Sequence, residues 1–365
     1  MRIGVLTTSL PSGTSGGAEM QAVVLAKRLS RDHEVTVFTR SSVPESAEPT
    51  PHYRIINRCR VKVRGARFIA DIAGTLWSIG RRRKSLDVLL AYQTVIDGVI
   101  AAIAKRVFGI PIVVAIRSEQ EYAFSRRAQA RWLGPFVFRG SDTIVVQTKT
   151  IRDDFVRALG SIGGPRLVDE ISSKLAIVPN GISLRHGECV RGEDVLYVGR
   201  LIEAKGVHHL VAAMRGCPGE RLVIAGSGPE ARRLEDAARG IPNIVFAGRV
   251  PPEELASYFE RAKILVMPSL RDEGMPNAVM EAMAWGIPVV ATRNAGIPDL
   301  VVDGETGILV APGDSSDLAN AIRTLAADEA LRSRFSRASR EAIKRYDWPK
   351  VVAANEAVLS NVVER

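Results

Sequence analysis

The sequence predicts an α/β protein built from two doubly wound, Rossmann-like domains that face each other across a cleft. Short apolar runs recur along the chain, and they are continuous rather than alternating, as expected for strands buried on both faces of a parallel sheet. Segments with apolar residues at helical spacing separate them, for example at Ala22, Leu25, Ala26 and Leu29. The runs form two series, which predicts two sheets rather than one.

The two series predict the strands in chain order. The first series predicts strands at Ile3–Thr7, Val35–Phe38, Val88–Leu90, Ile112–Ile116, Thr143–Val146 and Leu175–Val178. The second predicts strands at Val195–Val198, Leu222–Ala225, Ile244–Ala247, Ile264–Met267, Pro288–Ala291 and Gly307–Val310. We expect the Gly- and Pro-rich segment Gly160–Pro165 to form a loop before the last strand of the first series.

The domain boundaries follow from the breaks in this pattern. A polar interruption with Pro-Asn-Gly lies between Pro179 and Asp194, which divides residues 1–184 from residues 185–348. Near the end, Tyr346-Asp347-Trp348-Pro349 is predicted to end one helix and to begin the last, because Pro is favoured in a first helical turn. We expect residues 349–365 to form a terminal helix.

Composition places the chain among ordinary globular proteins. Its 365 residues are 46% hydrophobic and 25% charged. The cysteines Cys59, Cys189 and Cys217 are far apart and near no histidine pair, which favours a reducing compartment over a disulfide framework or a zinc site. The apolar run after Arg2 is too short for a secretory signal, and no uncharged stretch is long enough to span a membrane. We therefore expect a cytoplasmic protein.

Charge is distributed unevenly. The net charge is +10. Residues 1–184 hold 27 Lys and Arg against 15 Asp and Glu, or +12, whereas residues 185–365 hold 23 against 25, or −2. This asymmetry predicts an anionic surface or ligand for the first half.

The segment from Glu273 to Glu281 has the pattern of an anion site. Asn277, a favourable N-cap residue, is predicted to begin a helix that ends at Gly286. The amides of its first turn and the positive end of the helix dipole can bind an anion. Glu273 precedes this helix and Glu281 lies within it. The alternative is that both carboxylates are merely solvated charges.

Two further loops follow predicted strands. Gly199-Arg200-Leu-Ile-Glu-Ala-Lys205-Gly206 follows Val195–Val198 at the strand end where open α/β sheets bind ligands. Two fixed cations there can neutralise a diphosphate without a metal ion. Gly226-Ser-Gly-Pro follows the next strand, and its glycines permit either close approach of a ligand or a tight turn.

In this order, these motifs resemble the retaining nucleotide-sugar glycosyltransferases of family 4, which have the GT-B fold. The likeness covers nearly the whole chain. It includes Gly16-Gly17-Ala18-Glu19, Pro179-Asn180-Gly181, and the Ala-Met-Ala-x-Gly-x-Pro-Val-Val segment after Glu281. It implies a terminal helix that crosses back to the first domain, an N-terminal acceptor-side domain and a C-terminal domain that binds a nucleotide-diphosphate sugar.

The resemblance also implies roles for individual residues. Arg200 and Lys205 would grip the donor diphosphate, Glu273 would contact the donor sugar, and Glu281 would hold the ribose hydroxyls. The amides of residues 277–279 would meet the distal phosphate or sugar, and the loop around Arg249 would border the base. Catalytic roles therefore fall on Glu273, Arg200 and Lys205. The expected donor-binding residues are Gly16, Gly17, Arg117, Gly226, Arg249, Val250, Met275, Pro276, Asn277, Ala278, Val279 and Glu281.

Two departures from the family pattern bear on the substrate. Members often have a histidine after the strand that here ends at Ile116, near the donor sugar, and this chain has Arg117. Ser183 stands where Pro-Asn-Gly-x is usually followed by Asp. Arg117 is therefore expected either to bind substrate or to form a structural salt bridge.

By the family's example, the reaction needs no metal and no other cofactor, and it transfers a hexose-type sugar to an acceptor hydroxyl with retention of configuration. The expected acceptor is a sugar or a lipid-linked group used in glycolipid, polysaccharide or other cell-envelope glycan synthesis. The basic runs Arg81–Lys84 and Tyr122–Arg139 suggest weak docking to an anionic membrane at its inner face, and the alternative is that they are ordinary solvated arginines above a packed core. The alternatives are a nucleotide-sugar epimerase or hydrolase, and a nucleic-acid-binding protein, for which the sequence offers no recognition helix.

Overall fold

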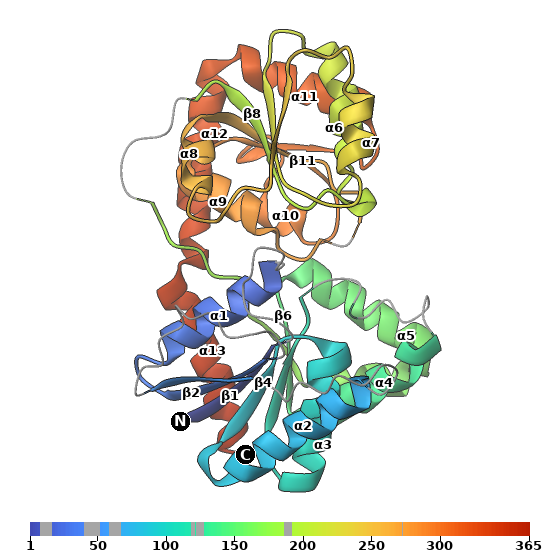
Figure 1. The fold of residues 1–365 in the computed structure, drawn as a ribbon, viewed down its shortest axis with the longest axis vertical. Helices are drawn as coiled ribbons and strands as arrows, with labels where there is room; N and C mark the ends of the chain where they lie inside the picture. The colour runs from blue at the N-terminus through green and yellow to red at the C-terminus, as the bar shows by residue number, and fades with distance from the viewer. Residues whose placement is uncertain are drawn as a thin grey trace. The chain divides into compact units, whose positions relative to one another are not determined.

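The computed structural model describes residues 1–7, 17–39, 52–57, 67–117, 121, 128–185, 192–271 and 273–365. The chain forms two compact units (Figure 1). Unit 1 contains Met1–Gly181 together with Pro349–Arg365, and unit 2 contains Ile182–Trp348. The division falls three residues before the end expected for the first domain.

Unit 1 contains a parallel sheet of strand order β3-β2-β1-β4-β5-β6-β7. The chain starts in the middle of the sheet at β1, which pairs with β2 on one side and with β4 on the other. This reversal of direction at β1 and β4 is a topological switch point, where ligands of open α/β sheets bind beyond the carboxyl ends of the strands. The strands are β1 (Arg2–Thr7), β2 (Glu34–Thr39), β3 (Tyr53–Asn57), β4 (Val88–Ala91), β5 (Ile112–Ala115), β6 (Thr143–Val146) and β7 (Leu175–Ile177).

Helices cover both faces of this sheet (Figure 1). Right-handed crossovers put α1 on one face, and they put α2, α3, α4 and α5 on the other because the chain then moves in the opposite direction. The helices are α1 (Gly17–Leu29), α2 (Arg67–Arg82), α3 (Val99–Phe108), α4 (Ala128–Gly140) and α5 (Lys149–Ser172), with a short 3₁₀ turn at Arg83–Ser85 and a π turn at Thr94–Gly98.

The last helix, α13 (Trp348–Val363), returns to unit 1 as the resemblance implied. The His33 ring nitrogen Nε2 lies 3.0 Å from Glu356 Oε1 of this helix. The Ser360 hydroxyl approaches the sulfur of Met1 at 3.6 Å. Pro349 lies in the first turn of the helix, where a missing N–H costs nothing.

Two features of unit 1 differ from the sequence analysis. The loop expected at Gly160–Pro165 is reduced to a kink: α5 consists of two helical stretches that meet at Gly164, whose φ of 66° and ψ of −169° are not helical, and Pro165 supplies no N–H. The sequence pattern also missed β3, because Arg54 and Asn57 interrupt its apolar run. An edge strand tolerates such polar residues, since only one of its sides is paired.

Unit 2 contains a second parallel sheet, of order β10-β9-β8-β11-β12-β13. Its switch point lies between β8 and β11, which pair directly. The strands are β8 (Asp194–Val198), β9 (Leu222–Ala225), β10 (Ile244–Gly248), β11 (Ala262–Met267), β12 (Val289–Thr292) and β13 (Gly307–Val310). Two doubly wound parallel α/β units therefore confirm the predicted fold class.

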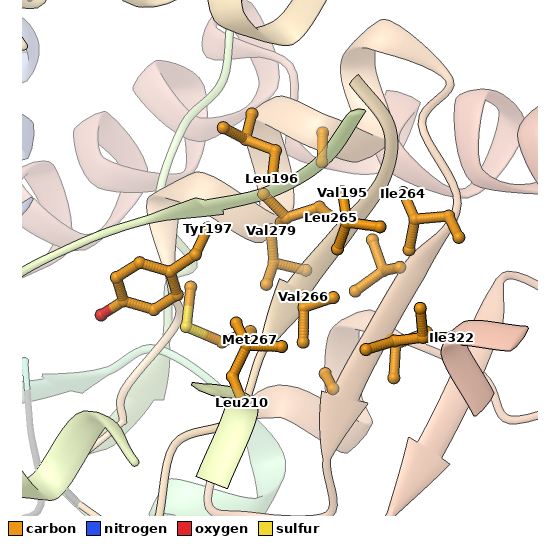
Figure 2. Packing of buried hydrophobic residues seen from close by; sticks show 14 of the residues in the cluster. Val195, Leu196, Tyr197, Leu210, Ile264, Leu265, Val266, Met267, Val279 and Ile322 are labelled. Carbon is orange, nitrogen blue, oxygen red and sulfur yellow. The ribbon is translucent and has the colours of Figure 1, made fainter. Parts of the chain in front are cut away.

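The helices α6 to α10 of unit 2 connect these strands, and α11 and α12 follow the last strand. They are α6 (Val207–Ala213), α7 (Ala231–Ala237), α8 (Leu255–Glu260), α9 (Asn277–Trp285), α10 (Ile297–Leu300), α11 (Ser315–Ala327) and α12 (Glu329–Ala342), with 3₁₀ turns at Glu203–Lys205, Met214–Gly216 and Ile343–Tyr346. Figure 2 shows Val279 of α9 among side chains of β8 and β11. This packing fixes the start of α9 against the two strands that flank the switch point.

Within the described ranges, no helix combines the length and the apolar character needed to cross a membrane.

Candidate active site

The predicted catalytic residues of unit 2 gather at the switch point between β8 and β11. Arg200 and Lys205 lie in the loop that follows β8, and Glu273 lies in the loop that follows β11. The two strands are direct neighbours in the sheet, so their following loops start side by side. The sheet topology therefore brings together residues that are far apart in the sequence.

The two loops are in direct backbone contact. The amide of Leu270 donates to the Ala204 carbonyl over 2.8 Å. Gly206 adopts φ 63°, and a Cβ atom there would lie 2.1 Å from the Pro268 carbonyl oxygen. Only glycine fits both the left-handed backbone and this approach. The glycine after Lys205 thus has a structural reason.

Lys205 and Glu273 form the central ion pair of the site. The Lys205 ammonium contacts Glu273 Oε1, and the Ser269 hydroxyl donates to the same oxygen over 2.5 Å. The Glu273 side chain is 5% exposed and that of Lys205 16%. Thr292 in turn donates to the Ser269 carbonyl over 2.5 Å. A buried carboxylate with both a cation and a hydroxyl donor is held in one orientation.

Arg200 differs from Lys205 because its side chain is exposed. Its backbone is fixed by the buried Tyr197 hydroxyl, which donates to the Arg200 carbonyl over 2.9 Å. Burial, together with the nearby Glu273 charge, raises the pKa of Tyr197 well above its usual value, so this hydroxyl stays a donor. Among the residues that the structure describes, no carboxylate forms an ion pair with the Arg200 guanidinium. This cation is therefore available to an anionic ligand.

The start of α9 differs from the prediction by one residue. Asn277 is the first helical residue and not the N-cap, because Pro276 has the extended conformation of a cap and its carbonyl accepts from the Val279 and Met280 amides. The Val279 amide, at 3.1 Å from that carbonyl, is thus already engaged. In the described part of the chain the Ala278 amide has no such partner, so it is the donor that this helix start offers to a ligand. The helix ends at Gly286 with φ 73°, as predicted.

Glu281 lies on α9 beside a cation that the sequence reasoning missed. Burial raises the pKa of Glu281 to about 7, and the positive charge of Arg185 acts in the opposite direction. The Arg185 guanidinium stacks 3.9 Å from the ring centroid of Trp285, one helical turn after Glu281. Arg185 belongs to no motif, and its only sequence signal is its place just after Pro-Asn-Gly.

The glycines of the loop after β9 serve backbone packing. A Cβ atom on Gly226 would lie 1.9 Å from the Gly199 carbonyl oxygen, and one on Gly228 would lie 2.2 Å from the Leu201 carbonyl oxygen. The Leu201 amide also donates to the Ser227 carbonyl over 2.9 Å. These contacts support the loop that carries Arg200.

The neighbouring loop after β10 completes this edge of unit 2. The Gly226 amide donates to the Gly248 carbonyl over 2.7 Å, which brings the predicted base-binding loop beside the Gly226 turn. Arg249 is exposed, and Val250 is half-buried. Met275 and Pro276 are both buried in front of α9.

The remaining predicted residues belong to unit 1. Gly17 is the first residue of α1, and Gly16 lies outside the described residues. Arg117 follows β5 at the carboxyl end of the strands and is only 6% exposed. It contacts Asn180, which the sequence reasoning noted only as part of a motif, and it contacts Tyr92, which that reasoning missed. Within the described ranges, no cluster of His, Cys, Asp and Glu is arranged as a metal site.

Family comparisons cover both units. A sequence model of the family described as "Glycosyltransferase Family 4" matches residues 15–186, and a model described as "Glycosyl transferases group 1" matches residues 192–328. The chain is also 28% identical over 344 residues to the sulfoquinovosyl transferase SQD2 of Arabidopsis thaliana, with 87% of this chain and 64% of that protein covered.

Solved structures share the fold across the whole chain. The sucrose-phosphate synthase of Thermosynechococcus elongatus superposes with a TM-score of 0.85 at 22% identity and covers 99% of each chain. HepE of Anabaena, solved in complex with UDP and glucose, superposes with a TM-score of 0.80 at 19% identity and covers 100% of each chain. At these identities the likeness establishes the fold, which is that of the GT-B proteins.

Proposed function

Because the chain belongs to glycosyltransferase family 4, we propose that it moves a hexose-type sugar from a nucleotide-diphosphate sugar to an acceptor hydroxyl, with retention of the anomeric configuration and without a catalytic metal. The proposed setting is the synthesis of a glycolipid, a polysaccharide or another cell-envelope glycan. The HepE complexes with UDP and with UDP-glucose support the donor class by analogy of fold.

The observation that carries this proposal is the cluster at the β8–β11 switch point. Lys205 and the exposed Arg200 supply two cations, and α9 begins four residues after Glu273. A diphosphate that bound there would meet two positive side chains and the amide end of a helix. Each charge-assisted hydrogen bond contributes about 1.5–3 kcal/mol, so the set is adequate for a dianionic ligand.

The other residues of unit 2 have consistent proposed roles. Glu281, one to two turns into α9, accepts hydrogen bonds from the ribose hydroxyls, and Arg249 and Val250 border the base. Glu273 uses its second carboxylate oxygen for the donor sugar, since Lys205 and Ser269 both contact Oε1. Gly226, Met275, Pro276 and the Asn277–Val279 backbone shape the surrounding surface.

The proposed chemistry follows from these charges. The bond between the anomeric carbon and the diphosphate oxygen breaks, and the acceptor hydroxyl oxygen forms a new bond on the same face of the sugar. The acceptor proton passes to a phosphate oxygen of the leaving nucleoside diphosphate. Arg200, Lys205 and the α9 amide end stabilise the negative charge that develops on that leaving group, which lowers the barrier.

The test is a transfer assay with a panel of nucleotide-diphosphate sugars, run in excess EDTA with and without a mixture of sugar and lipid-linked acceptors. The proposal expects an acceptor-dependent glycoside whose anomeric configuration, read by NMR coupling constants, equals that of the donor. An isomerised or hydrolysed sugar formed equally well without acceptor would identify an epimerase or a hydrolase instead.

A second observation supports weak docking to an anionic membrane. Trp77 on α2 is 63% exposed, and the Arg81 guanidinium lies 4.9 Å from its ring centroid. The exposed run Arg81–Lys84 follows directly. An exposed Trp beside clustered cations is typical of surfaces that meet lipid headgroups. Because α2 leads into the start of β4, this surface lies at the amino end of the strands of unit 1. Docking through it would leave the carboxyl edge of that sheet, where ligands are expected to bind, free of the membrane.

A further inference from the structure

Arg117 is a buried cation that forms no ion pair with any residue that the structure describes. Its NH1 donates to Asn180 Oδ1 over 3.3 Å, and its guanidinium carbon lies 4.4 Å from the ring centroid of Tyr92. Its Nε–H has no hydrogen-bond partner although it is buried. Across the described ranges, no carboxylate forms an ion pair with it. A neutral amide and an aromatic face are weak compensation for a desolvated charge.

Glu121 interacts electrostatically with Arg117, but its two carboxylate oxygens accept hydrogen bonds from groups other than the Arg117 guanidinium. One of its oxygens accepts from the Arg117 backbone amide over 2.9 Å. The other accepts from the Thr94 amide and hydroxyl over 2.9 and 3.0 Å. Burial raises the pKa of Glu121 to about 7, with those hydrogen bonds and the Arg117 charge acting in the opposite direction. Burial therefore opposes ionisation of this carboxyl group, which makes it a poor counter-ion for Arg117.

The neighbouring side chains form a rigid polar frame. Gln147 donates through Nε2 to the same Asn180 oxygen over 2.8 Å, and its own Oε1 is buried without a partner. Gln21 of α1 exchanges two hydrogen bonds with the backbone of Gly181, at 2.9 and 3.0 Å. These bonds hold the segment at Asn180 in place. The Arg117 Nε–H and the Gln147 Oε1 are thus one donor and one acceptor of this frame that no described residue satisfies.

This frame stands where unit 1 is built to receive a ligand. Arg117, Gln147 and Asn180 follow β5, β6 and β7, and Tyr92 follows β4, so all four lie at the carboxyl edge of the sheet, and Tyr92 follows a strand of the switch point itself. Leaving a buried charge unpaired costs several kcal/mol, which a methionine or leucine of similar size would avoid. The net charge of residues 1–184, which is +12, has the same sign as Arg117 and also favours an anionic ligand.

We propose that unit 1 binds a substrate that has an acidic group besides the donor diphosphate, and that Arg117 is the counter-ion of that group. The chemical class is a phosphate, sulfonate or carboxylate substituent on a sugar. The inference rests on the proposed glycosyltransferase function, and it gives Arg117 a ligand where the sequence predicted only a donor-binding residue. The acidic group comes either from the acceptor or from the donor sugar.

The test is calorimetric binding of three probes to the full-length protein: glucose 6-phosphate, glucuronate and neutral glucose. The wild type is expected to bind at least one acidic probe tenfold or more tightly than glucose. Arg117→Gln is expected to remove that preference, and Arg117→Lys, which keeps the charge, to retain part of it. Arg139→Gln is the matched control, because it removes an exposed cation of the same unit that is paired with Glu170. Equal affinities for all three probes in the wild type, or an unchanged preference in Arg117→Gln, would overturn the proposal.

Two further experiments show which substrate has the acidic group and test the donor site separately from Arg117. Transfer assays that pair a neutral donor sugar with acidic acceptors, and an acidic donor sugar with neutral acceptors, show which substrate has the group. Binding of UDP and GDP, which tests the donor site of unit 2, is expected to be the same in Arg117→Gln and the wild type. If the wild type binds neither UDP nor GDP, the proposed function is wrong. If it binds a nucleotide but does not prefer the acidic probes over glucose, only this inference is wrong. If Arg117→Gln does not fold, the proposal is tested with Arg117→Lys, which should retain part of the preference for the acidic probe, and with inorganic sulfate, which should compete with that probe for the wild type. An unchanged preference in Arg117→Lys together with no competition by sulfate would overturn the proposal.

Discussion

Lys205 and Glu273, 68 residues apart in the chain, form an ion pair whose carboxylate is almost fully buried. The pair joins the loop after β8 to the loop after β11 at the switch point of unit 2. An ionic contact in such a place costs desolvation energy, and a purely apolar contact between the loops would avoid that cost. The pair therefore indicates a site that needs a fixed cation and a fixed carboxylate.

Replacing Lys205 separates its catalytic from its structural contribution. Lys205→Ala leaves the Glu273 carboxylate buried with Ser269 as its remaining donor, so we expect a loss of stability of about 3 kcal/mol. We also expect kcat to fall by about a hundredfold or more, since a stabilising charge on the leaving group is lost. Thermal unfolding and initial rates measure the two effects.

The control is Lys263→Ala. Lys263 forms an ion pair with Glu220 at 2.5 Å in the same unit, and both side chains are 17% exposed, but it lies near the start of β11 and away from the site. This variant is expected to lose stability and to keep its rate. If both variants lost activity in the same proportion, the role of Lys205 would be structural alone.

The pKa of Glu281 predicts a pH dependence of both stability and nucleotide binding. Burial raises this pKa from its usual 4.5 to about 7 in the folded protein. Between those values the folded state holds a proton that the unfolded state has released, so Glu281 makes stability fall as pH rises through this window. The stability of Glu281→Gln relative to the wild type is therefore expected to rise from pH 5 to pH 8, as chemical denaturation can show.

Nucleotide binding is expected to have the opposite trend. The ionised carboxylate is the better acceptor for ribose hydroxyls, so the affinity of the wild type for a nucleoside diphosphate should rise through pH 7. Comparison with Glu281→Gln at each pH removes the titration of the nucleotide itself. Arg185→Ala should move the midpoint upward, because Arg185 favours the charged form. Parallel pH profiles for the wild type and Glu281→Gln would refute the ribose assignment.

The glycine contacts predict a steric effect on the Arg200 loop. Gly226→Ala puts a Cβ atom 1.9 Å from the Gly199 carbonyl oxygen, so the two loops must separate. We expect stability to fall by a few kcal/mol and activity with it. Gly219→Ala, where a Cβ atom meets nothing within 4 Å, is the matched control and should be neutral or slightly stabilising. Equal melting temperatures for the two variants would contradict the packing that the structure gives to Gly226.

The sequence predicted the two-unit fold and most of the strands because parallel strands buried on both faces are continuous apolar runs. It also predicted that Arg200, Lys205 and Glu273 share a site. It could not show that Lys205 and Glu273 contact each other, since that depends on which strands are neighbours. The order in which β8 pairs with β11 is a tertiary property, set by crossover geometry rather than by either loop.

The errors have physical causes of the same kind. Gly160–Pro165 was predicted as a loop because Gly and Pro disfavour helix, and the helix does break there, but only at Gly164, with helical residues on both sides. Asn277 was predicted as a cap from its propensity, whereas the backbone of Pro276 takes that role. Arg185, Gln147 and Tyr92 were missed because they acquire their neighbours only on folding.

The exposed surface of α2 predicts a salt-dependent membrane interaction. Vesicles with phosphatidylglycerol are expected to co-sediment the wild type at low salt, and vesicles of phosphatidylcholine alone are not, because attraction to anionic headgroups is screened by salt. Arg81→Glu with Arg82→Glu should abolish the interaction, and Trp77→Ala should weaken it. Arg31→Glu, an exposed cation at the end of α1 on the other face of the sheet, serves as the control. If the protein co-sedimented equally with both kinds of vesicle, or if only the Arg31 change reduced co-sedimentation, the α2 surface would not be the membrane-binding surface.

The most direct test of the site is the preference for a nucleoside diphosphate over the corresponding monophosphate, measured by calorimetry in excess EDTA. The wild type should bind the diphosphate about tenfold or more tightly, and Arg200→Ala, which removes an exposed guanidinium, should lose most of that preference while its melting temperature stays nearly unchanged. A wild type that binds both nucleotides equally unless Mg²⁺ is added, or an Arg200→Ala protein with the full preference, would contradict the diphosphate site.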